Sequence, residues 1–174
     1  MGLLGVGVVL GLVSCSGHRA GPPVVVGFEA AEYAGEWHEV ARLPNFFERD
    51  VVAAKAIYGV REEGGLTVKN LGLKDDGERT EITGKATAPD PAVPAKLKVR
   101  FDRFPANLFA GDYWVLAFDE EEGRAMVGGP GRKYLWLLAK DEAATKEDFG
   151  DFLKQAEEVG YDTSEMIFNP KRLP

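Results

Sequence analysis

The segment that decides the fold is residues 96–102, Lys96-Leu97-Lys98-Val99-Arg100-Phe101-Asp102. Charged and apolar side chains alternate across it without an exception. Because successive side chains of a strand point to opposite faces, Leu97, Val99 and Phe101 share one face. The segment is therefore predicted to be a strand with one face buried and the other in water.

Further strand-like segments lie on both sides of residues 96–102. Glu62-Glu63-Gly64-Gly65 joins two of them, and its glycines allow the positive φ angles of a hairpin turn. A proline-rich run over residues 89–94 and Gly129-Pro130-Gly131 mark other turns. The eight expected strands are residues 36–43, 52–61, 66–71, 81–88, 96–102, 112–119, 124–128 and 133–140.

One helix is expected after these strands. Thr145 stands at the N-cap position, Asp148 at the matching capping-box position, and Gly160 at the end. The apolar stripe of this helix consists of Phe149, Phe152, Leu153, Ala156 and Val159. A short last strand follows near residues 166–168. The pattern predicts an all-β protein, an eight-stranded antiparallel up-and-down β-barrel with one C-terminal α-helix packed outside, whose interior holds one small ligand.

Two of the expected strands, residues 112–119 and 133–140, are apolar on both faces. In the first of them, strict alternation separates Trp114, Leu116 and Phe118 from Tyr113, Val115 and Ala117. One face would line the lumen. The other face would be covered by the helix or by a second copy of the chain in a homodimer, and both alternatives stay open.

Composition limits the number of domains and the kinds of partner. The chain has 174 residues, of which 45% are hydrophobic and 28% charged, which suits one domain with its own core. A formal net charge of −7 repels nucleic acid, so DNA and RNA are not expected as partners. The single cysteine, Cys15, excludes an internal disulfide and a zinc site built from several thiolates. No metal or cofactor is expected.

The N-terminus has the pattern of an export signal. Residues 3–13 are uncharged and too few to span a bilayer. Leu12-Val13-Ser14-Cys15 is similar to the lipobox of bacterial lipoproteins, whose cysteine becomes the acylated N-terminus; the alternative is a buried structural cysteine. We therefore expect a signal peptide over residues 1–14, a lipidated tether over residues 15–27 and a barrel domain over residues 28–174.

The residue after the cysteine bears on location. Ser16 follows Cys15, and the absence of Asp there resembles lipoproteins sorted to the outer membrane. The expected location is the cell outer membrane, facing the periplasm, with the acyl chains on Cys15 as the anchor.

Residues 33–48 resemble the first motif of the lipocalins, which contains Gly-x-Trp, here Gly35-Glu36-Trp37. The form is that of bacterial outer-membrane lipocalins and the apolipoprotein D branch. Gly111-Asp112-Tyr113 is similar to the second lipocalin motif, and residues 134–140 to the third. The resemblance covers roughly residues 28–170 and implies a bacterial lipocalin lipoprotein.

The third motif normally ends in Arg, which stacks on the Trp of the first motif at the closed end of the barrel. This chain has Lys140 at that position. Lys140 can still make a cation–π contact with Trp37, worth about 0.5–2 kcal/mol, but it lacks the planar guanidinium fork. The resemblance thus implies that Trp37 and Lys140 close the barrel.

The resemblance and the apolar alternation together imply that the lumen binds, stores or transports a long-chain fatty acid or a lysophospholipid for envelope maintenance. The expected ligand-binding residues are Trp37, Glu39, Ala56, Tyr58, Val99, Phe101, Tyr113, Val115, Trp136 and Leu138. Ala41 is expected to point inward with them. The carboxyl of Glu39 needs a hydrogen-bond partner, such as Tyr58 or a ligand head group, or it becomes neutral.

Other functions remain as alternatives. Haem or a pigment is a second class of ligand, although His38 alternates outward from Trp37 and His18 lies in the tether. Catalysis is not expected, because lipidation uses the only cysteine and no Gly-x-Ser-x-Gly motif is present. A barrel filled by its own side chains, serving as a structural module, is a third possibility. Residues 105–110 are expected at the rim of the mouth.

Overall fold

The computed structural model describes residues 21–173, so the expected signal peptide, the lipobox and Cys15 lie outside the described residues. The strands are β1 (Gly35–Arg42), β2 (Val51–Val60), β3 (Leu66–Lys74), β4 (Arg79–Thr87), β5 (Lys96–Phe101), β6 (Gly111–Asp119), β7 (Arg124–Gly128), β8 (Leu135–Ala139) and β9 (Ile167–Phe168). The α-helices are α1 (Ala30–Tyr33) and α2 (Gly150–Glu158), and the 3₁₀ helices are η1 (Ala106–Leu108), η2 (Glu147–Phe149) and η3 (Thr163–Glu165). Within residues 21–173, every helix is too short or too polar to cross a membrane.

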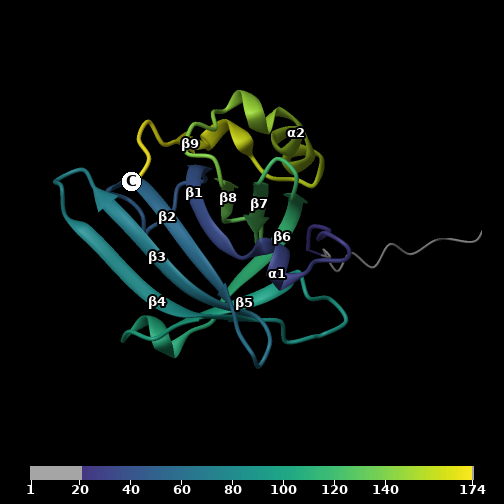
Figure 1. The fold of residues 1–174 in the computed structure, drawn as a ribbon. Helices are drawn as coiled ribbons and strands as arrows, with labels where there is room; N and C mark the ends of the chain where they lie inside the picture. Colours follow the sequence, from purple (N-terminus) through teal and green to yellow (C-terminus); the bar gives the residue numbers. More distant parts are fainter. Residues whose placement is uncertain (1–20, 174) are drawn as a thin grey trace, which may run out of the picture.

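The first eight strands close into an antiparallel barrel (Figure 1). Each strand from β2 to β7 pairs with the next, and β1 closes the circle by pairing with both β8 and β2. β9 adds a short pairing to the end of β1. The hairpin between β2 and β3 uses Gly64 and Gly65 at φ 90° and 78°, as the sequence predicts. The predicted eight-stranded up-and-down barrel is confirmed.

The strands separate two apolar clusters. The inner cluster fills the barrel and includes Leu97 and Val99 of β5, which confirms the alternation expected for residues 96–102. The outer cluster lies between the wall formed by β1, β6, β7 and β8 and the C-terminal elements. Strands with two apolar faces therefore lie where the wall is covered on both sides.

Two bulges interrupt strict alternation. In β1, Glu39 and Ala41 oppose the adjacent residues Leu138 and Leu137 of β8, so β1 carries one extra residue. The expectation for Ala41 was therefore wrong: it packs in the outer cluster, and Arg42 takes the inward position.

The second bulge lies in β6, between Val115 and Ala117. It moves Ala117 into the outer cluster and Phe118 into contact with the inner one. The faces expected for these two residues were therefore wrong as well. An extra residue reverses the face of every side chain that follows it.

Helix α2 covers the outer wall, beside β6 and β7 in Figure 1. Phe149, Phe152 and Ala156 are buried in the outer cluster together with Met126 and Leu137 of the wall. Thr145 donates to Asp148 Oδ2 through its N–H and its hydroxyl, which is the expected pairing. However, η2 follows this pair and α2 begins only at Gly150, so the expectation that Thr145 is the N-cap of the α-helix was wrong. The helix thus covers the outer apolar face of the wall. A second copy of the chain was the alternative cover for this face.

The chain enters β1 across the closed end of the barrel. Phe28 and Tyr33 are buried in the inner cluster, and Trp37 Nε1 donates to the Tyr33 carbonyl at 2.8 Å. Part of the expected tether also packs on the barrel, since Pro22 is fully buried and Val25 N donates to the Val115 carbonyl at 3.0 Å. The N-terminal segment therefore seals one end and leaves the other end as the mouth.

Candidate functional site

All ten expected ligand-binding residues lie in the barrel interior. The buried ones in the inner cluster are Trp37, Ala56, Tyr58, Val99, Val115 and Leu138. Phe101, Tyr113 and Trp136 pack against this cluster and are only partly buried. Glu39 is 4% exposed and pairs with Leu138 across β1 and β8, so it shares the inward face. The lumen therefore has an apolar and aromatic wall, parts of which remain accessible.

Three tyrosines form a hydroxyl cluster at the floor of the lumen. Tyr113 of β6 lies 2.8 Å, oxygen to oxygen, from both Tyr33 of α1 and Tyr58 of β2. Tyr33 stacks on Trp37, with 4.9 Å between ring centroids. Burial raises the pKa of all three phenols, so they remain neutral hydrogen-bonding groups at ordinary pH.

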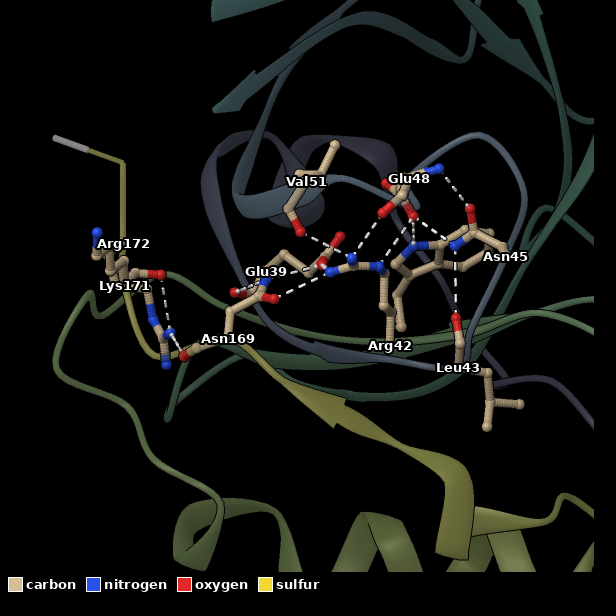
Figure 2. A network of polar contacts seen from close by, with 10 residues as sticks. Glu39, Arg42, Leu43, Asn45, Glu48, Val51, Asn169, Lys171 and Arg172 are labelled. Carbon is tan, nitrogen blue, oxygen red and sulfur yellow. Dashed lines mark hydrogen bonds and ion pairs between the residues drawn. The ribbon is translucent and has the colours of Figure 1, made fainter. Parts of the chain in front are cut away.

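A buried polar network lies along the inner side of β1 (Figure 2). Arg42 Nη1 donates to Glu39 Oε1 at 2.8 Å and to Asn169 Oδ1 at 2.9 Å. Its Nη2 donates to the carbonyl oxygens of Glu48 at 2.7 Å and Val51 at 2.8 Å. Arg42 therefore ties β1 to the loop before β2 and to the C-terminal segment. Glu39 bonds to Arg42 and Asn169, so the expected hydrogen bond to Tyr58 is absent from the described residues.

The same network fixes the loop between β1 and β2. Glu48 Oε2 lies 3.7 Å from Arg42 Nε and accepts a hydrogen bond from Trp136 Nε1 at 3.1 Å. Asn45 donates to Glu48 Oε2 at 2.6 Å and accepts from the Glu48 backbone N–H at 3.0 Å. A wall residue of the lumen, Trp136, is thereby held by the loop at the mouth.

The Glu39 carboxyl has a pKa close to neutral pH. Burial raises the pKa of Glu39 to about 7, and the nearby Glu48 carboxylate acts in the same direction. Arg42 and the hydrogen bond from Asn169 oppose this rise. The lumen therefore contains one acid whose charge changes near neutral pH.

Comparison with known proteins places this barrel in a family. Residues 28–171 match the family description "Lipocalin-like domain". The chain belongs to the lipocalin family.

Two curated relatives of this lipocalin are outer membrane lipoproteins named Blc. The one from Vibrio cholerae is 36% identical over 90% of this chain and 91% of the relative, and the one from Escherichia coli K12 is 37% identical over 90% and 88%. Among solved structures, insecticyanin from the tobacco hornworm Manduca sexta has a TM-score of 0.68 at 27% identity, covering 85% of this chain and 83% of that one. Sequence and structure thus agree on the family.

The closed end of this lipocalin carries Lys140 where the family motif has Arg. Lys140 Nζ lies 5.2 Å from the centroid of the Trp37 ring and donates to the Glu32 carbonyl at 3.2 Å. Lys140 is exposed, while Trp37 is fully buried. The lysine therefore covers the outside of the tryptophan that closes the barrel.

The mouth of the lipocalin barrel is rich in exposed aromatic side chains. Phe47 of the β1–β2 loop packs against Tyr134 and Trp136, at centroid distances of 5.6 and 6.3 Å. Phe104 and Phe109, in the loop between β5 and β6, are each 73% exposed. Residues 105–110, which were expected at the rim, form this loop and contain η1.

Sequence reasoning missed three residues of the lumen: Tyr33, Arg42 and Asn169. Alternation assigns Arg42 to the outer face, and only the bulge turns it inward. Asn169 lies 127 residues beyond Arg42, so no local pattern connects them. Tyr33 precedes the first strand, so the alternation of strand faces does not predict where its side chain lies.

The described residues also contain a pocket and a histidine outside the lumen. A pocket of about 340 Å³ lies on the outer wall, between Val40, Lys146, Phe168 and Arg172, and is separate from the lumen. His38 also faces outward, 3.6 Å from Glu36. Residues 21–173 contain no group of three or more His, Cys, Asp or Glu side chains that could hold a metal ion.

Proposed function

We propose that this lipocalin carries a long-chain fatty acid or a lysophospholipid in its lumen while acyl chains on Cys15 hold it at the outer membrane. The family binds small hydrophobic ligands, and the proposal narrows the ligand to a single-chain lipid. The supporting observation is the inner wall, on which Phe101, Tyr113 and Trp136 are inward-facing yet only partly buried.

The shape and chemistry of the wall suit an acyl chain. Transfer of apolar surface from water contributes about 25 cal/mol per Å², so a lumen lined by aromatic and aliphatic groups favours an apolar occupant. Small side chains such as Ala56 and Ala86 share the inner cluster with large ones such as Tyr58 and Trp136. This mixture supports a slender chain as the ligand better than a broad planar pigment.

A haem ligand has less support. Haem iron is held by His, Cys, Met or Tyr side chains. His38 lies on the outer wall against Glu36, and the hydroxyls of the lumenal tyrosines, Tyr33, Tyr58 and Tyr113, are hydrogen-bonded to one another. Burial lowers the pKa of His38, so this histidine stays neutral at ordinary pH. Its position, outside the lumen, also gives no support to a catalytic role.

The anchor places the carrier beside its source of lipid. The lipobox-like residues 12–15 support acylation of Cys15, and the curated relatives are named outer membrane lipoproteins. Two or three acyl chains give stable membrane attachment. The protein faces the periplasm, where it serves envelope maintenance by storing or moving single-chain lipids.

The first test is titration of the delipidated protein with a fluorescent fatty acid. We expect saturable binding that unlabelled fatty acid or lysophospholipid displaces. Val99→Trp fills the lumen and should weaken binding at least tenfold, whereas Thr87→Trp on the exposed face of β4 should not change it. Circular dichroism checks that both variants fold. Absence of saturable, displaceable binding would contradict the proposal.

A further inference from the structure

Most of the exposed apolar side chains of the barrel gather on two loops. Residues 21–173 contain eight large hydrophobic side chains that are exposed, and five of them lie on the β1–β2 and β5–β6 loops. We call these five the rim patch: Phe46, Phe47, Phe104, Leu108 and Phe109. The other three stand singly on other parts of the chain. Single exposed apolar residues are ordinary, whereas a concentration of them marks a surface that meets an apolar partner.

The two loops of the rim patch lie at one end of the barrel, on opposite sides of the mouth. Because consecutive strands are antiparallel, the β1–β2, β3–β4, β5–β6 and β7–β8 connections all lie at the same end. Strands β1 and β5 are four places apart in the closed ring of eight, so the loops that follow them face each other across the mouth. A partner that contacts both loops at once therefore spans the mouth.

The charged groups of the rim suit the head groups of zwitterionic lipids. Arg49 and Arg103 are exposed beside the phenylalanines, and neither side chain forms an ion pair within residues 21–173. The β3–β4 turn, between the two loops, adds the exposed acids Asp75 and Asp76. A zwitterionic phospholipid offers phosphate to the arginines and a cationic group to the acids. A second copy of this chain, with its own formal net charge of −7, would be repelled. The rim patch therefore fits a lipid bilayer better than a homodimer.

The N-terminal segment brings the mouth end close to the membrane. A Cβ atom on Gly21 would contact the Trp114 ring and Pro130 Cα, so the backbone at Gly21 lies against the β7–β8 turn. That turn belongs to the mouth end. Cys15, the expected site of acylation, stands six residues before Gly21, and six residues span at most about 20 Å. An acyl anchor on Cys15 therefore keeps one side of the mouth near the bilayer.

We propose that the mouth of the barrel docks on the membrane, with the rim patch inserted among the head groups of a zwitterionic bilayer. Apolar and aromatic side chains that enter this region are typical of proteins that lie on a membrane surface. The inference rests on the proposed acyl anchor and adds an orientation to it. The anchor makes docking of the rim an intramolecular event, which favours it. A lipid can then pass between bilayer and lumen without crossing water.

The test places a tryptophan on each loop and measures its quenching by brominated lipid. The protein, purified from cell membranes, is reconstituted in phosphatidylcholine vesicles with or without bromine on the acyl chains. Phe46→Trp and Phe109→Trp each add fluorescence to that of wild type, and most of this added signal should be lost in the brominated vesicles. Val60→Trp is the matched control, because Val60 is 58% exposed on the β2–β3 hairpin at the opposite end. Its added signal should not change.

A second set of variants tests whether the two loops dock as one surface. Phe104→Ser combined with Leu108→Ser removes apolar groups from the β5–β6 loop. It should abolish most of the quenching of the Phe46→Trp reporter on the opposite loop, because burial of apolar surface drives insertion. Lys85→Ser combined with Thr87→Ser, on the exposed face of β4, is the control and should leave this quenching unchanged. Circular dichroism checks that all variants fold.

Three outcomes would overturn the inference. The first is equal quenching at Val60→Trp and at the two loops, and the second is persistence of Phe46→Trp quenching after the Phe104 and Leu108 substitutions. The third is absence of quenching at either loop, the result expected if the rim patch binds a second copy of the chain or another protein. The palmitate content of the same preparation is measured separately, so failure of the anchor is distinguished from failure of the rim.

Discussion

At the scale of single residues, the lumen combines an apolar wall with a buried charged group, the Arg42 guanidinium, which is paired with Glu39. Arg42 is 2% exposed, and its two terminal nitrogens make four hydrogen bonds, two to carboxamide or carboxylate oxygens and two to backbone carbonyls. Burying a charge is costly unless such partners are present. Arg42 therefore makes it possible for Glu39 to face the interior.

Glu39 makes stability depend on pH. Burial raises its pKa from the usual 4.5 to about 7, so the folded protein holds this proton more tightly than the unfolded chain. The stability that this group contributes is complete below about pH 4.5 and is lost as the pH rises through about 7. Glu39→Gln, which mimics the protonated acid, should therefore gain stability relative to wild type between pH 5 and pH 8, by on the order of 1–3 kcal/mol.

The measurement is urea unfolding of both proteins at the two pH values. Glu81→Gln is the matched control, since the Glu81 side chain is 54% exposed and pairs with Lys69 on the surface. This control should show the same difference from wild type at pH 5 and at pH 8. If Glu39→Gln also differed from wild type by the same amount at pH 5 and at pH 8, Glu39 would not titrate in this range.

At the scale of the elements, alternation predicts faces well until a bulge intervenes. Leu97 and Val99 lie inside, as expected, because β5 pairs with both neighbours without a shift in register. Ala41 and Ala117 lie outside, because β1 and β6 each carry one extra residue. A bulge depends on how two strands meet, which the sequence of either strand alone does not reveal.

Helix α2 contributes to stability through packing on the barrel wall. Phe152 is 7% exposed and lies in the outer cluster with Phe149. Phe152→Ala should lower the free energy of unfolding by about 3–5 kcal/mol, because it removes a buried ring and leaves a cavity. Lys154→Ala on the exposed face of α2 should change it by less than about 0.5 kcal/mol. Equal losses in the two variants, measured by chemical denaturation, would show that the helix does not pack as described.

At the scale of the whole molecule, barrel closure encloses the lumen and leaves one open end. Closure of β1 onto both β8 and β2 encloses the lumen, and residues 21–33 seal one end. The mouth is left with exposed aromatic loops around Phe47, Phe104 and Phe109. The proposed ligand is therefore expected to enter from this open end.

Attachment to the membrane is expected to depend on one atom, the sulfur of Cys15. Cells that produce the wild-type chain should incorporate labelled palmitate into it and retain it in the membrane fraction. Cys15→Ser should abolish the label and release the protein, because no other cysteine is present. Ser16→Ala is the control and should keep both. Palmitate in the Cys15→Ser protein would contradict acylation at this residue.

The sequence by itself determined the strand count, the faces of the regular strands, the outer helix and the family, because each depends on residues close together in the chain. The motif around Trp37 and the alternation over residues 96–102 are signals of this kind. Only the tertiary structure decided which polar groups meet in the lumen. Arg42 with Asn169, and Tyr33 with Tyr113, are 127 and 80 residues apart and come together through strand bulges and barrel closure. Contacts of that kind depend on how the whole chain packs, so no local pattern carries them.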